Sequence, residues 1–184
     1  LQLGAMALAG NLDVMAVGIT QIGILDIDGT SSFNAGAGVI TLNNDNDFTG
    51  AVSLNNTGSY AVSIKDVNAI QLGASNVGND LAVTAKLGIT STAKLIVAGN
   101  STFSAGAGVI TLNNVTNDFT GAVSLNNTGA NAVAITDANA IELGASSVGT
   151  TTLTVTGVGI TQTGALTVAG VSTFNTLVSG DDII

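Results

Sequence analysis

The chain has 184 residues, of which 46% are hydrophobic but only 3% aromatic and 8% charged, and its formal net charge is -9. Its 3 basic residues are too few to neutralise a nucleic-acid backbone or to attract an anionic membrane surface, which argues against both kinds of partner. Since there is no cysteine, histidine or arginine, disulfides and thiolate metal sites are excluded and catalysis has few of its usual side chains.

Short runs of alternating apolar and polar residues follow one another along the chain. Each run is only three or four positions long, which indicates a strand, and each is bounded by Gly, Asn, Asp or Ser, which indicates a turn. From residue 39 the runs are VITL (39–42), DFT (47–49), AVSL (51–54), AVSI (61–64), AIQL (69–72), LAVT (81–84), GIT (88–90), LIV (95–97) and STF (101–103). Glycine and β-branched residues are too dense for helix, and no helical periodicity is present.

The sequence repeats itself almost residue for residue. The segment FNAGAGVITLNNDNDFTGAVSLNNTG (33–58) returns as FSAGAGVITLNNVTNDFTGAVSLNNTG (103–129), with one residue inserted. Phe33, Phe103 and Phe174 mark equivalent points of successive units. QLGA (2–5) and ITQ (19–21) belong to an earlier copy. The repeats therefore divide the chain into a partial unit (1–32), two full units (33–102 and 103–173) and the start of a fourth (174–184).

Nine short strands in each unit predict about three rungs of three strands per 70–71-residue repeat, roughly 23–24 residues per rung, as in a parallel β-helix. In this all-β fold each strand pairs with its equivalent one rung away, and Val, Ile and Leu stack in the core. A β-sandwich or a propeller is the main competitor, but sandwich strands are usually longer than these runs. Along a strand, Ile135 is expected to point inward and Ser124, between Val123 and Leu125, outward.

The tracts GVITLNN, DFTGAVSLNNTG, AIELGAS and GALTVAGVSTF resemble the repeat regions of large bacterial surface adhesins of the filamentous-haemagglutinin and autotransporter type. This resemblance implies a right-handed parallel β-helix (a β-solenoid), export through the outer membrane and an extracellular, cell-surface location. It carries no catalytic motif to transfer, so we expect no enzyme and assign no catalytic, cofactor-binding or metal-binding residue.

The function expected is that of a structural or adhesive rod in contact with host cells, surfaces or a biofilm matrix. Because the chain begins and ends inside the repeat pattern, we expect a single solenoid segment of a longer protein. A subunit that self-associates end to end or laterally into a filament is an alternative interpretation. A β-helix that binds or degrades polysaccharide is a weaker one.

Asparagines are the first local candidates for a site. Four pairs follow apolar strands, where turns or amide ladders between rungs explain them better than a ligand does: 43–44, 55–56, 113–114 and 126–127. Four N-x-[ST] sequons, at Asn55, Asn100, Asn114 and Asn126, leave glycosylation open, although chance matches are expected in this composition.

Acidic, threonine and lysine residues are the remaining candidates. Asp26, Asp28, Asp45 and Asp47 could offer oxygen ligands to Ca²⁺, but no calcium-loop pattern surrounds them, so solvated turn carboxylates are the preferred interpretation. Three threonines alternate over 152–156, yet the matching LAVTAK (81–86) lacks the array, which argues against an ice-binding face. The lysines, which distinguish the units, are interpreted as surface substitutions that also protect strand edges: Lys65, Lys86 and Lys94.

Overall fold

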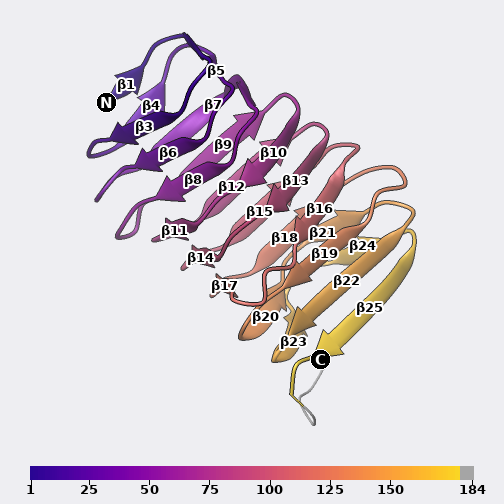
Figure 1. The fold of residues 1–184 in the computed structure, drawn as a ribbon. Coiled ribbons are helices and arrows are strands. Elements are labelled where there is room, and N and C mark those ends of the chain that lie inside the picture. Colours follow the sequence, from indigo (N-terminus) through magenta and orange to yellow (C-terminus); the bar gives the residue numbers. More distant parts are fainter. Residues whose placement is uncertain (179–184) are drawn as a thin grey trace.

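The structure is a computed structural model that describes residues 1–178 and consists of strands and turns throughout that range. The chain coils into a stack of about 9 turns, running from the N-terminal turn to the C-terminal turn in Figure 1. Strands of successive turns pair in parallel, which confirms the parallel β-solenoid predicted from the repeats. No helix within residues 1–178 is long and apolar enough to cross a membrane.

Two sheets form the two broad faces of the stack. The first sheet has 13 strands: β1 (Gln2–Leu3), β2 (Met6–Leu8), β4 (Ile19–Gln21), β5 (Leu25–Ile27), β7 (Ile40–Phe48), β9 (Val62–Asp66), β12 (Leu81–Ala85), β15 (Ser101–Ser104), β18 (Val123–Asn126), β20 (Ala140–Leu143), β21 (Ser146–Val148), β23 (Gly159–Gln162) and β24 (Leu166–Val168). The second has 12: β3 (Leu12–Met15), β6 (Ser31–Asn34), β8 (Val52–Asn55), β10 (Ala69–Leu72), β11 (Ser75–Val77), β13 (Gly88–Ser91), β14 (Leu95–Val97), β16 (Val109–Leu112), β17 (Asp118–Phe119), β19 (Val133–Thr136), β22 (Thr152–Gly157) and β25 (Val171–Thr176).

The turns of the solenoid generally contain fewer residues than the roughly 23–24 per rung expected from the sequence. Measured along the chain between paired residues of adjacent turns, the shortest turn runs from Gln2 to Thr20, and the longest runs from Ile110 to Val133. Most turns combine one straight strand on one face with two short strands, separated by a bend, on the other. β12 followed by β13 and β14 is one such turn, so the expected three strands per turn are present.

The repeat is out of phase with the turn. Ser31 pairs with Val52, Val52 with Leu72 and Leu72 with Ser91, so three turns are complete at Ser91, before the unit ends. Ser101, the equivalent of Ser31 in the next unit, lies half a turn further on and in the opposite sheet. One repeat unit therefore spans about three and a half turns, which refines the expected three. As a consequence, equivalent strands β6, β15 and β25 lie alternately on the second, first and second sheets.

The core is a continuous column of aliphatic side chains with aromatic pairs at intervals. Phe33 and Phe48 meet edge to face across it, with ring centroids 6.0 Å apart, and Phe103 and Phe119 repeat this contact at 6.0 Å. All four rings are fully or almost fully buried. Each pair joins the two faces, because Phe33 lies on β6 of the second sheet and Phe48 on β7 of the first.

The expected orientations along two strands are confirmed. Ile135 on β19 is only 1% exposed, whereas Ser124 on β18 is half-buried between the fully buried Val123 and Leu125. Residues 179–184 of the expected fourth unit lie outside the described residues.

Ile135→Asp should lower the free energy of unfolding by roughly 4 kcal/mol or more, because it places an unpaired charge between apolar rungs. Urea unfolding followed by circular dichroism measures the loss. The matched change Ser124→Asp, on an outward position, should cost about 1 kcal/mol or less. Equal losses for the two variants would contradict the inward position of Ile135.

Candidate functional site

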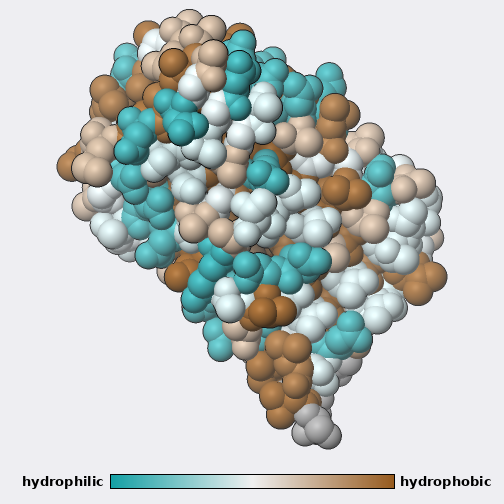
Figure 2. Space-filling view, viewed as in Figure 1, coloured by the Kyte–Doolittle hydropathy of each residue, from teal (hydrophilic) through white to brown (hydrophobic). Residues whose placement is uncertain are grey.

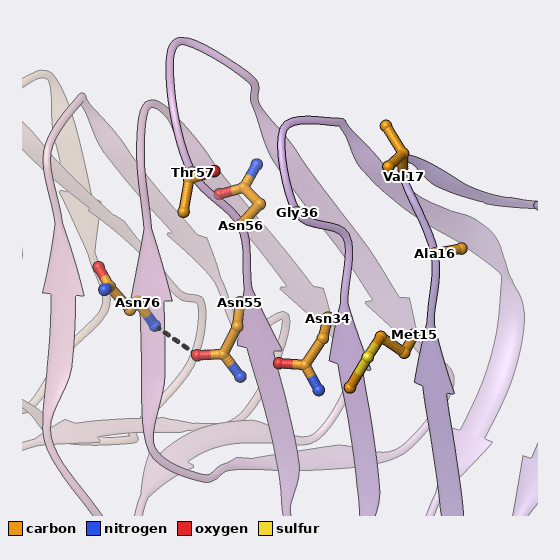
Figure 3. A pocket seen from close by; sticks show the side chains of 9 residues that line it. All are labelled: Met15, Ala16, Val17, Asn34, Gly36, Asn55, Asn56, Thr57 and Asn76. Carbon is orange, nitrogen blue, oxygen red and sulfur yellow. Dashed lines mark hydrogen bonds between the residues drawn. The ribbon is translucent and has the colours of Figure 1, made fainter.

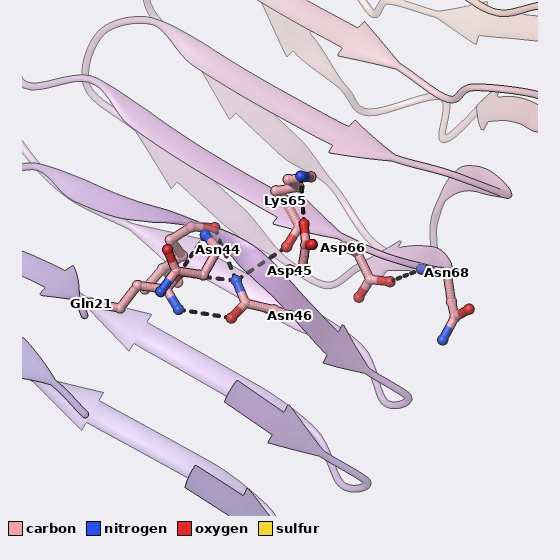
Figure 4. Close-up of polar contacts among 8 residues, drawn as sticks. Gln21, Asn44, Asp45, Asn46, Lys65, Asp66 and Asn68 are labelled. Atoms are coloured by element: carbon pink, nitrogen blue, oxygen red, sulfur yellow. Dashed lines mark hydrogen bonds and ion pairs between the residues drawn. The ribbon is translucent and has the colours of Figure 1, made fainter. Parts of the chain in front are cut away.

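A buried asparagine lies where the first sheet changes from two short strands to one straight strand. There the register between β7 and β9 shifts between Leu42 and Asn46. The Nδ2 of Asn46 lies 3.0 Å from the Leu42 carbonyl, 3.1 Å from the Lys65 carbonyl and 3.0 Å from Gln21 Oε1. Its Oδ1 accepts hydrogen bonds from Gln21 Nε2 (2.8 Å; Figure 4) and from the Leu25 N–H (3.0 Å). One fully buried amide thus replaces the backbone ladder across the irregularity.

The next repeat builds the same junction on the opposite face. Asn117 is fully buried in the second sheet, and its Nδ2 donates to the carbonyls of Leu112 (2.9 Å) and Thr136 (3.3 Å). Its Oδ1 accepts from the Leu95 N–H at 2.9 Å. The shared tripeptide Asn-Asp-Phe, at 46–48 and 117–119, survives the one-residue insertion between the copies. That persistence is the sequence signal for this junction, which the strand pattern alone did not reveal.

A buried serine bridges the complementary junction, where one straight strand pairs with two short ones. Ser75 Oγ accepts from the Leu54 N–H at 3.1 Å and donates to the Gly73 carbonyl at 3.0 Å. In the next repeat Ser146 accepts from the Leu125 N–H at 3.0 Å and donates to the Gly144 carbonyl at 3.0 Å. These hydroxyls occupy the bend between β10 and β11 and between β20 and β21. They satisfy backbone groups that the bend leaves without ladder partners.

Two buried carboxyls complete the junctions. Asp66 accepts the Phe48 N–H on Oδ2 at 2.9 Å and the Asn68 N–H on Oδ1 at 2.6 Å. Asp137 does the same, with Phe119 at 2.8 Å and Asn139 at 2.7 Å. Burial raises the pKa of both carboxyls above the usual value for Asp, and the backbone N–H donors only partly oppose that rise. Both side chains therefore act as acceptors for backbone donors inside the solenoid.

Two grooves run along the rod axis on its surface. The second-sheet groove follows the ends of β3, β6, β8 and β11, where Met15, Asn34, Asn55 and Asn76 lie in register on successive turns. Its wall is formed by the turns that follow these strands, and its volume is about 530 Å³. Figure 3 shows the Asn34 and Asn55 side chains projecting side by side, with the Asn76 N–H donating to Asn55 Oδ1 at 3.1 Å.

The first-sheet groove lies on the opposite face and is longer. Lys65, Thr84, Ser104, Asn126 and Ser147 line its floor in register on five successive turns. Two adjoining cavities of about 460 and 240 Å³ share its middle residues. The half-turn phase of the repeat makes the two grooves equivalent: the positions of Ser104, Asn126 and Ser147 correspond to those of Asn34, Asn55 and Asn76. No single copy of the sequence reveals either groove.

The asparagine pairs divide by position. Asn56 is buried, donates to the carbonyls of Gly38 (3.0 Å) and Tyr60 (2.7 Å), and accepts from the Gly78 N–H at 3.0 Å. Asn127 braces the equivalent turn in the next repeat. The structural interpretation of these two is therefore confirmed. Their partners Asn55 and Asn126 line the grooves, and Asn43 and Asn113 are exposed.

The four sequon asparagines use their side-chain oxygens within the fold. Asn55 Oδ1 accepts the Asn76 N–H and Asn126 Oδ1 accepts the Ser147 N–H, at 3.1 and 3.2 Å. Asn100, which is exposed, accepts the Ala122 N–H at 3.0 Å. Asn114 Oδ1 accepts the Thr116 N–H at 2.9 Å. Their glycosylation stays an open question.

The acidic candidates lie on the surface. Asp26 and Asp28 are exposed, and Asp45 forms an ion pair with Lys65 at 2.5 Å, which lowers the pKa of the Asp45 carboxyl. Asp47 is half-buried and in register with Asp26. Within residues 1–178 no three such side chains gather closely enough to hold a metal ion.

The threonine array and the lysines also take the expected surface positions. Thr154 and Thr156 are half-buried and Thr152 is exposed, on the outward side of β22, and Ala134 interrupts their column on the neighbouring strand. Lys65 and Lys86 line one end of the first-sheet groove. The lysine in the turn before β14, Lys94, is exposed.

Comparison with known proteins gives one match. A family model described as Repeats of unknown function (DUF5649) matches residues 1–55, 59–126 and 130–184. The second match begins at position 59 and the third at position 130, a spacing that agrees with that of the units in the sequence. No curated protein and no solved structure matches the chain.

Asn46→Ala should cost about 2–4 kcal/mol of unfolding free energy, because it leaves several buried backbone groups without partners. Chemical denaturation measures the loss. Asn44→Ala, close by on the same strand and half-buried, is the matched control and should cost about 1 kcal/mol or less. A small loss for Asn46→Ala would show that the amide does not hold the junction together.

The raised pKa of Asp66 and Asp137 predicts a pH dependence of stability. Their contribution is fully present below the unfolded-state pKa and is lost as pH rises through the higher folded-state pKa. Between acidic and neutral pH, the wild type should therefore lose stability relative to the double variant Asp66→Asn/Asp137→Asn. Unfolding measured across that range gives this difference.

Asp45→Asn supplies a control of opposite sign. Because Lys65 lowers the pKa of Asp45, the wild type should lose stability relative to this variant as pH falls, not as it rises. The effect should be small, since the pair is exposed and screened by solvent. The same sign for both variants would contradict the assignment of the buried carboxyls.

Proposed function

The chain belongs to the family described as Repeats of unknown function (DUF5649), and we propose that it is a structural or adhesive rod segment of an exported bacterial cell-surface adhesin. The observation that carries this proposal is the unbroken parallel pairing of strands through the whole described stack. In such a solenoid each turn contacts only the turns next to it. The length of the rod therefore grows with the number of repeats, while its cross-section stays constant.

The recurring interior of the repeat supports a role for the rod itself. The junction residues Asn46 and Asp66 reappear as Asn117 and Asp137 with equivalent hydrogen bonds to the backbone. The chain thus repeats the devices that keep the stack continuous. A role based on one unique site would instead require one copy to depart from the pattern.

We propose that the chain has no catalytic role. The carboxyls of Asp66 and Asp137, whose pKa is raised by burial, each accept hydrogen bonds from two backbone N–H groups. Those bonds occupy both oxygens in supporting the fold. The resemblance to adhesin repeats agrees with this proposal.

Location on the cell surface is the sharpest test of the proposal. An antiserum raised against the purified chain should label intact cells of the source organism, and protease added outside the cells should remove the signal. A cytoplasmic protein of the same organism serves as the control for cell integrity. Labelling that appears only after lysis would overturn the proposal.

Self-assembly into a filament is the alternative. Electron microscopy of the purified chain separates the two hypotheses, because a shaft segment should give discrete short rods over a wide concentration range. Long filaments whose number grows with protein concentration would favour the alternative.

A further inference from the structure

We propose that the first-sheet and second-sheet grooves each bind a neutral, linear polysaccharide along the rod axis, so that one rod bridges two polysaccharide chains. This inference is independent of how the chain is exported. It stands on the shape of the grooves, on the chemistry of their floors and on their position on opposite faces.

The floor of the first-sheet groove fits an extended, repetitive ligand. One side chain from each of five successive turns lines it, from Lys65 to Ser147. At about 4.8 Å per turn, these residues cover roughly 19 Å along the axis. A polymer lying in the groove would meet a similar hydrogen-bonding position at every turn.

The floor also offers hydrogen-bonding groups that the fold does not use. Among the described residues, no intramolecular hydrogen bond involves the side-chain oxygens of Thr84, Ser104 and Ser147 or the Nδ2 of Asn126, whose Oδ1 accepts the Ser147 N–H. The second-sheet groove offers Nδ2 of Asn55 and the whole amide of Asn76 in the same way. Hydroxyls donate and accept, and amides provide both functions. Such a mixture suits the hydroxyl groups of sugars.

Two other classes of ligand fit less well. An extended peptide binds by adding a strand to a free sheet edge, but the floor strands already have neighbours on both sides, as β15 has β12 and β18. A polyanion would meet a chain of net charge -9. Lys65 and Lys86 lie together at one end of the groove, where Lys65 is paired with Asp45, and the floor positions from Thr84 to Ser147 carry no charge. A neutral polysaccharide avoids both difficulties.

The half-turn phase of the repeat accounts for the bridging. Equivalent floor positions, such as Asn55 and Asn126, lie in opposite sheets about three and a half turns apart, roughly 17 Å along the axis. Over the face drawn in Figure 2, hydrophilic residues are interspersed with hydrophobic ones along the stack. Two grooves with polar side chains along their floors, facing away from each other, would hold two separate polymer chains.

The test uses the purified chain with soluble neutral polysaccharides (hydroxyethyl cellulose, laminarin, dextran and mannan) and with alginate as the polyanion. Affinity electrophoresis should show retardation by at least one neutral polymer and none by alginate. Binding to alginate alone, or to none of the polymers, would overturn the proposal.

Blocking variants then locate the binding. Ser104→Glu fills the first-sheet groove, and Asn55→Glu fills the second-sheet groove. Each single variant should still bind but should lose the turbidity that bridging produces, and the double variant should lose binding at least tenfold. Unchanged binding by a double variant that keeps its circular dichroism spectrum and thermal midpoint would overturn the assignment to the grooves.

Matched controls separate the grooves from the surface at large. Thr102→Glu lies on β15, and Ser53→Glu on β8, each on the same strand as the blocked position and on the same outward side of it. Both add the same charge outside the grooves. They should therefore keep binding and turbidity within about twofold, whereas a loss equal to that of the groove variants would point to a general charge effect and overturn the proposal.

Discussion

The parallel backbone ladder between successive turns is the constraint on which the rest of the molecule depends. A buried N–H or C=O group without a partner costs about as much as a lost hydrogen bond, and every turn buries a row of such groups. A uniform stack would satisfy this requirement with backbone alone. This chain does not stack uniformly, because its straight and bent sides exchange faces along the rod.

Buried polar side chains reconcile the ladder with that exchange. Asn46 and Asn117 bridge the junctions where two short strands give way to one straight strand, while Ser75 and Ser146 bridge the complementary junctions, where one straight strand pairs with two short ones. Charged or polar groups inside a narrow aliphatic core are costly unless their bonds are satisfied. Here each of these side chains has partners in the backbone of adjacent turns. The polar interior is therefore a requirement of the half-turn phase rather than an imperfection of the core.

The sequence alone predicts the class of fold, but it does not predict how many turns one repeat unit contains. Alternating runs and the return of Phe33 as Phe103 reveal strands and repeat length, because side-chain periodicity is local. The length of one turn depends on which residues pair, such as Val52 with Leu72, and that offset leaves no periodic trace in the sequence. Asp66 was hidden for a related reason, since a polar residue after an apolar strand usually marks an exposed turn. The grooves were hidden because each floor draws its residues from separate turns of the chain.

The half-turn phase also changes what a repeated sequence means for recognition. If a unit contained a whole number of turns, every copy of a surface feature would line up on one face. With about three and a half turns per unit, the equivalent residues Asn55 and Asn126 lie on opposite faces of the rod. Adding units to such a rod lengthens two equivalent faces together instead of one. Under the proposed bridging role, one repeated unit would supply both the shaft and its two contact surfaces, without any specialised domain.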